Sequence, residues 1–192
     1  MSGDENKIDL DFTAHFAAEE VKSEKIPAPE KVVLDPEFRI GTSKLEADGF
    51  FVAVARRNLA GPDLPEDCHV MVVEDEPVTN SVLQKVLATD GFKVHGAFDA
   101  AGLGQLLTRR VPDLILLDIE LPKVSGLQIL ARIRKHPRLH AIPVLIVTSR
   151  ADMSDVVRGF ALGANGYLSK PVTVENLRAV LRQILGALPR KP

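Results

Sequence analysis

From Cys68 onward, short apolar runs alternate with longer segments in which apolar residues recur at helical spacing. A short apolar run between turn formers is typical of a strand buried on both faces of a parallel sheet. Five strands are predicted, at Val70–Val73, Lys93–Ala97, Leu114–Leu117, Val144–Val147 and Gly166–Leu168. Five helices are predicted after them, at Pro77–Asp90, Ala100–Thr108, Leu127–Lys135, Asp152–Leu162 and Val174–Leu185. This alternation indicates an α/β fold with a doubly wound, five-stranded parallel sheet and right-handed crossovers.

The chain before residue 67 has a different pattern. Residues 1–30 are acidic and poor in large apolar side chains, which predicts a flexible tail. Residues 31–66 are predicted to form a small β-hairpin segment and a linker, because Asp48-Gly49 separates the strand-like runs Leu45–Ala47 and Phe50–Ala55. So short a hairpin is marginal alone, so we expect it to pack on a neighbour or a partner chain. Residues 67–188 are expected to form the main domain.

Charge separates the same two parts. Residues 1–66 hold 14 acidic and 8 basic side chains, whereas residues 67–192 hold 12 and 16, and the whole chain has a net charge of −2. The one dense basic stretch, Arg132–Arg138, is better explained as a helix end than as a nucleic-acid interface. Cys68 is the only cysteine, which excludes an internal disulfide or a cysteine-cluster metal site. The apolar runs are too short for a membrane span and the N-terminus is acidic, so a cytoplasmic location without membrane contact is expected.

Polar residues follow the predicted strands where these end. Glu74, Asp75 and Glu76 follow the first strand, Asp118 the third, Thr148-Ser149 the fourth, and Ser169-Lys170-Pro171 the fifth. In the flavodoxin-like strand order 2-1-3-4-5 the first and third strands are neighbours, so Glu74, Asp75 and Asp118 should converge at the carboxyl edge. Carboxylates so close would repel one another without a hard cation, and oxygen ligands are what Mg²⁺ prefers. Lys170 would add a fixed positive charge, and the whole set is suited to accept a phosphoryl group.

At these positions the sequence resembles the response-regulator receiver family of two-component signalling. The matching strings are Val72-Val73-Glu74-Asp75-Glu76-Pro77, Asp113-Leu114-Ile115-Leu116-Leu117-Asp118 with Pro122 and Gly126, Val147-Thr148-Ser149, and Gly163-Ala164-Asn165-Gly166-Tyr167-Leu168-Ser169-Lys170-Pro171. Any one of them alone is weak, but together they are specific. The resemblance covers residues 68–188 and does not extend to the first 66.

The resemblance implies a role for each matching residue. Asp118 would be the phosphoacceptor and Lys170 would pair with the phosphoryl oxygens. Mg²⁺ would be held by Glu74, Asp75, Asp118 and the backbone carbonyl of Glu120. Thr148 and Tyr167 would be the switch pair, while Ser149 and Arg150 flank the site.

The leading hypothesis is a single-receiver response regulator, not an enzyme, that is phosphorylated by a sensor histidine kinase or a histidine phosphotransfer protein. After Leu185 only residues 186–192 remain, so we expect it to signal by binding a downstream protein, with no nucleic acid involved. The surface would be formed by the fourth helix, the fifth strand and the fifth helix, and homodimerisation is possible. One alternative is a docking module that is never phosphorylated. Another is a phosphatase with Asp118 as nucleophile and Glu120 as acid/base.

Two further expectations concern side-chain positions. Tyr167 is expected to fill space vacated by Thr148 after phosphorylation, and the plainer alternative is a half-buried aromatic without a switching role. Glu120 and Arg150 follow neighbouring strands and are expected to meet as an exposed ion pair across the mouth of the site, although both could instead point into solvent.

Overall fold

The computed structural model describes residues 52–54, 65, 67–150, 152–186 and 188–189. Five parallel strands form the centre of the sheet, in the order β3, β2, β4, β5, β6. Their bounds are β2 His69–Val73, β3 Lys93–Ala97, β4 Leu114–Leu117, β5 Val144–Thr148 and β6 Gly166–Ser169. The order predicted from the sequence is therefore confirmed, and each predicted strand lies within one residue of its observed bounds.

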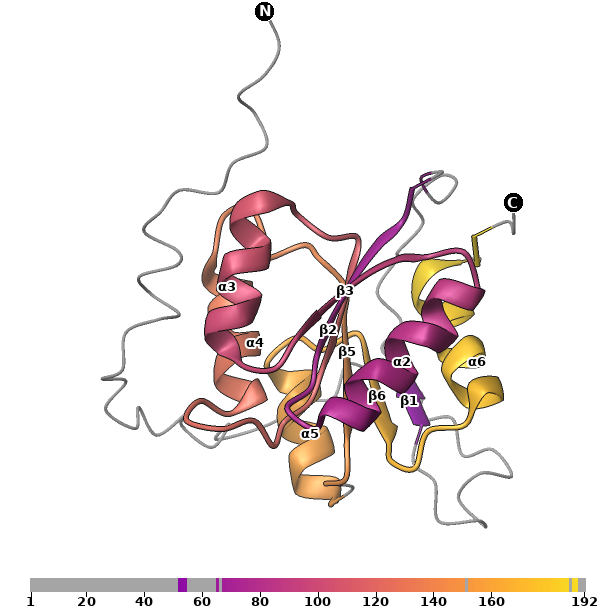
Figure 1. Ribbon diagram of the computed structural model, residues 1–192. Coiled ribbons are helices and arrows are strands. Elements are labelled where there is room, and N and C mark those ends of the chain that lie inside the picture. Colours follow the sequence, from indigo (N-terminus) through magenta and orange to yellow (C-terminus); the bar gives the residue numbers. More distant parts are fainter. Residues whose placement is uncertain (1–51, 55–64, 66, 151, 187, 190–192) are drawn as a thin grey trace, which may run out of the picture.

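Helices cover both faces of this sheet (Figure 1). They are α2 Pro77–Thr89, α3 Ala100–Arg109, α4 Gly126–Lys135, α5 Met153–Ala161 and α6 Val174–Leu185. α2 and α6 lie on one face, and α3, α4 and α5 lie on the other. Within the described residues, no helix is both long enough and apolar enough to cross a bilayer.

The helix ends follow local signals in the sequence. Pro77 begins α2, and the Glu76 carboxylate caps it by accepting hydrogen bonds from the amides of Val78 and Thr79. Ser125 and Gln128 form a capping box at the start of α4. Gly186 ends α6 in a left-handed conformation (φ 78°), which glycine adopts without steric cost.

The sheet has a sixth strand that the five-strand prediction does not include. β1, Val52–Val54, pairs antiparallel with β6, and Ala53 lies opposite Tyr167. These three residues lie within the second arm of the predicted hairpin, and they pair with the sheet, whereas the hairpin itself stays a prediction. The first arm, Leu45–Ala47, and the predicted tail over residues 1–30 lie outside the described residues.

Two apolar layers hold the helices to the sheet. Successive side chains of a strand point to opposite faces of the sheet, and all four residues of β4 are buried. Ile115 and Leu117 face α3 and α4. Leu114 and Leu116 face α2 and α6. Burial of such side chains contributes about 1.5–3 kcal/mol each. The arrangement fixes the carboxyl ends of the central strands, where the polar residues follow.

Candidate functional site

Glu74 and Asp75 are positioned by the turn between β2 and α2. The Glu74 amide donates to the carbonyl of Ala97 at the end of β3, at 3.0 Å. The buried Asn80 side chain lies across the same turn and donates to the carbonyls of Glu74 and Ala97, both at 2.9 Å. The Glu74 side chain is consequently buried, whereas Asp75 is exposed.

Asp118 directly follows the buried strand β4 and is itself 3% exposed. Its amide donates to the carbonyl of Val73, and its Oδ1 accepts from the amide of Glu120, both at 3.0 Å. The loop after it is packed against the first residue of α4, because a Cβ placed on Gly126 would lie 1.9 Å from the Asp118 carbonyl oxygen. Only glycine permits so close an approach.

Lys170 connects the two acidic strand ends. Its Nζ lies 2.6 Å from Oδ2 of Asp118 and 2.6 Å from Oε2 of Glu74. The first contact has the geometry of a hydrogen bond, whereas Glu74 Oε2 has no aligned donor, so the second contact is an ion pair only. The Lys170 amide donates to the Thr148 carbonyl at 2.8 Å, which fixes the lysine backbone beside the end of β5.

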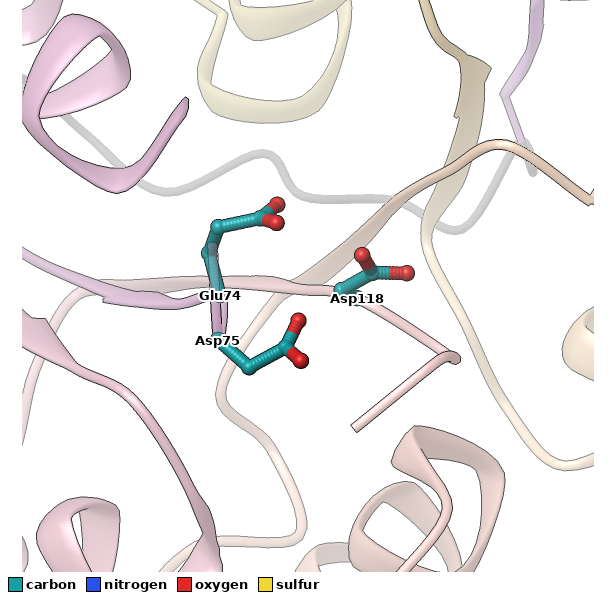
Figure 2. Close-up of side chains that lie close together, drawn as sticks. All are labelled: Glu74, Asp75 and Asp118. Carbon is teal, nitrogen blue, oxygen red and sulfur yellow. The ribbon is translucent and has the colours of Figure 1, made fainter. Parts of the chain in front are cut away.

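Three carboxylates gather at this edge of the sheet, and Lys170 contacts two of them. One oxygen from each of Glu74, Asp75 and Asp118 lies within 4.8 Å of the other two, and Figure 2 shows the carboxylates gathered around a common space. Burial raises the pKa of Glu74, and the attraction of Lys170 offsets this only in part. Burial alone would lower the pKa of Lys170, but Asp118 and Glu74 outweigh it and raise that pKa. The excess negative charge and the hard oxygen donors fit a divalent cation such as Mg²⁺.

Thr148 and Tyr167 are both fully buried. The Tyr167 hydroxyl donates to the carbonyl of Arg150, and the Arg150 amide donates to Oγ1 of Thr148 at 3.3 Å. Burial is the main reason that the pKa of Tyr167 is raised. The alternative of a half-buried aromatic is therefore wrong, whereas the expected movement of Tyr167 with Thr148 stays a prediction.

The expected ion pair between Glu120 and Arg150 does not form. Arg150 Nε instead lies 2.7 Å from Oδ2 of Asp155 in the first turn of α5, and the Glu120 carboxylate accepts from the Ser149 hydroxyl. Asp155 competes better because its side chain is only 10% exposed, so less solvent screens the pair. Ser149, in place of Arg150, is the partner of the Glu120 carboxylate. The mouth of the site thus has two separate contacts where a single gate was expected.

The structure brings together Glu74, Asp75, Asp118 and Lys170, and places Thr148 next to them through the Lys170 backbone. The suggested part of the Glu120 carbonyl in metal binding stays a prediction. Sequence reasoning missed Asn80 and Asp155. Asn80 carries a recognisable signal, since a polar residue among the apolar positions of a predicted helix needs a partner, whereas Asp155 resembles an ordinary first-turn acid.

A family model for the response regulator receiver domain matches residues 70–182. The DNA-binding dual master transcriptional regulator RpaA of Synechocystis sp. is 35% identical over 123 residues, which are 64% of this chain and 51% of RpaA. TorR of Escherichia coli, the torCAD operon transcriptional regulatory protein, is 34% identical over 117 residues, 61% of this chain and 50% of TorR. The chain thus spans about half the length of these curated relatives.

Solved structures show the same fold. A putative response regulator from Chloroflexus aurantiacus superposes with a TM-score of 0.60 at 30% identity, over 63% of this chain and 99% of that one. The receiver domain of a sensor histidine kinase from Pseudomonas aeruginosa has a TM-score of 0.57 at 27% identity, over the same shares. That structure holds a magnesium ion coordinated in its active site cleft.

Proposed function

Because the chain belongs to the response regulator receiver family, we propose that it accepts a phosphoryl group on Asp118 in a Mg²⁺-dependent reaction. The donor would be a phosphohistidine of a sensor histidine kinase or a histidine phosphotransfer protein. The observation that carries the proposal is the buried Asp118 carboxylate, 2.6 Å from the Lys170 ammonium and within 4.8 Å of Glu74 and Asp75.

Each residue of the site has a distinct part in this reaction. A carboxylate oxygen of Asp118 attacks the phosphorus, and the imidazole of the donor leaves. Lys170 already contacts Oδ2 of Asp118, so its ammonium is placed to pair with the transferred phosphoryl oxygens. Glu74, Asp75 and Asp118 would hold Mg²⁺, which would offset the charge that develops on the phosphoryl group. The Glu120 amide keeps Asp118 Oδ1 oriented.

A protein phosphodonor fits the surface around the site. Among the described residues, four large apolar side chains are at least half exposed: Val78, Val82, Phe98 and Met153. All four lie in the segments that leave the carboxyl ends of the strands, on α2, after β3 and at the start of α5. Exposed apolar side chains near a polar site favour protein docking.

The output would be a phosphorylation-dependent interaction with a downstream protein. The proposed surface consists of α5, β6 and α6, and Tyr167 of β6 is hydrogen-bonded to the loop that follows Thr148. A change at Asp118 can reach this surface through that loop. We also propose that the receiver domain acts in the cytoplasm and that it signals without catalysing turnover of a substrate.

Incubation with acetyl phosphate, followed by mass measurement of the intact protein, tests the proposal. We expect one phosphoryl adduct with Mg²⁺, none with EDTA, and none in Asp118→Asn. No adduct on the wild-type protein with Mg²⁺ would favour the docking module. Continuous release of inorganic phosphate without an accumulating adduct would favour the phosphatase.

A further inference from the structure

The outer edge of β6 is paired by a strand from the opposite end of the chain. Val52, Ala53 and Val54 lie opposite Leu168, Tyr167 and Gly166 in antiparallel register. β1 also contacts α6, which packs beside β6. Among the described strands, β1 is thus the one that covers this edge of the sheet, and Figure 1 shows it next to β6.

The central residue of this pairing on β6 is Tyr167. Its ring is fully buried in a slot made by α5 and β5. A Cβ placed on Gly159 would lie 2.7 Å from Ile146 Cδ1 and 3.4 Å from Tyr167 Cδ2, so glycine at this point of α5 leaves room for the Ile146 side chain, and α5 lies within van der Waals distance of the ring. The hydroxyl donates to the Arg150 carbonyl, two residues after Thr148.

The ring has α5 on one side, and Ile146 of β5 is the strand partner of Tyr167. A ring that turned outward would therefore move toward the other edge of β6, away from β5. That edge is where β1 pairs, and neighbouring strands lie only about 4.8 Å apart. An outward Tyr167 and a paired β1 consequently compete for the same space.

We propose that residues 52–54 form a tethered strand that holds Tyr167 in its buried position, so that pairing of β1 and phosphorylation of Asp118 favour each other. The inference rests on the proposed function and on the expectation that Tyr167 fills space vacated by Thr148 after phosphorylation. Coupling between two sites is reciprocal, so each event should strengthen the other by the same factor. A strand of three residues pairs weakly by itself, so phosphorylation of Asp118 can shift the equilibrium between paired and unpaired β1.

Hydrogen exchange of the full-length protein tests the coupling without any substitution. We expect Mg²⁺ with beryllofluoride, a stable phosphoryl mimic, to slow amide exchange in residues 52–54 and 166–169 by about fivefold or more, the lower end of usual coupling factors. Unchanged or faster exchange in both segments would overturn the proposal. Exchange that slows only in a dimer, detected by light scattering, would also overturn it, since the strand would then come from a second copy.

A pair of variants provides the reciprocal test. Val52→Pro with Val54→Pro removes two backbone donors, whereas Val52→Thr with Val54→Thr keeps both the donors and the β-branched shape. We expect the proline variant to bind beryllofluoride about fivefold more weakly and to expose Tyr167 to acrylamide quenching, while the threonine variant behaves as the wild type does. Equal binding in all three proteins would overturn the inference.

Labelling separates this inference from the function on which it rests. If acetyl phosphate labels wild-type Asp118 but the proline and wild-type proteins bind the mimic equally, only the β1 coupling fails. If wild-type Asp118 takes no label at all, the proposed function fails as well.

Discussion

Lys170 Nζ lies 2.6 Å from a carboxylate oxygen of Asp118 and 2.6 Å from one of Glu74, so one ammonium joins the ends of two neighbouring strands. Both carboxylates are almost fully buried, whereas the lysine side chain is 20% exposed. The lysine thus compensates part of their negative charge, and under the proposed function it would also contact the phosphoryl group.

We expect Lys170→Ala to lower the free energy of unfolding by about 3 kcal/mol in EDTA, because breaking a buried pair leaves charges without compensation. Saturating Mg²⁺ should reduce that loss, since the cation would supply positive charge at the same carboxylates. Acetyl phosphate should still label Asp118, but the variant should not signal. Chemical denaturation with and without Mg²⁺ measures the first effect, and Lys85→Ala on the exposed side of α2 is the control. A loss that is equal in EDTA and in Mg²⁺ would contradict this account of the site.

The contacts at the mouth predict how the phosphoryl lifetime depends on neighbouring residues. Glu120→Ala and Ser149→Ala should each speed dephosphorylation by at most about fivefold, because exposed contacts contribute only about 0.2–1 kcal/mol. The double variant should be no faster than either single one. Glu120→Ala combined with Arg150→Ala should instead be additive, since Arg150 pairs with Asp155. A non-additive result for Glu120 and Arg150 would mean that the two residues act as one gate after all.

Arg134 ties the end of α4 to two loops. Its guanidinium donates to the carbonyls of His140, Ile142 and Gly163 and to the side chain of Asn165. We expect Arg134→Ala to cost about 2–4 kcal/mol of unfolding free energy, because several charge-assisted hydrogen bonds are lost together. Arg134→Lys should recover only part of this, since lysine lacks the planar fork.

Lys135→Ala, one residue further along α4 and exposed, is the matched control and should change stability by less than about 0.5 kcal/mol. Urea denaturation compares the three variants. If Arg134→Ala were as mild as Lys135→Ala, the hydrogen-bond network would have no role in stability.

Cys68 should be unreactive in the folded protein. Its side chain has no exposed surface, and burial, with a smaller contribution from Asp113, raises its pKa to about 12. The folded-state pKa is above the unfolded value of about 8.5, so this thiol contributes stability below about pH 8.5 and the contribution is lost as the pH rises toward 12. A thiol reagent at pH 8 should label the protein in denaturant but not in buffer. Rapid labelling in buffer would show that Cys68 opens to solvent.

Much of the fold could be predicted from the sequence because apolar strands and helical periodicity are local signals. The acidic residues and Lys170 could also be placed, since the carboxyl ends of parallel strands meet at one edge. The pairing of β1 could not, because Val52–Val54 is a short run whose partner lies at the far end of the chain. The partner of Arg150 was missed for a related reason: strand order predicts which loops are neighbours but not which of two nearby acids is better shielded from solvent.

The most direct test of the central claim is to identify the carboxyl group that carries the phosphoryl adduct. After brief treatment with acetyl phosphate and Mg²⁺, borohydride would reduce an acyl phosphate of aspartate to homoserine, and peptide mass spectrometry would locate it. We predict homoserine at residue 118 in the wild-type protein and at no position in Asp118→Asn. Homoserine at another aspartate, or none at all when the intact protein has gained a phosphoryl group, would contradict the assignment of Asp118 as the acceptor.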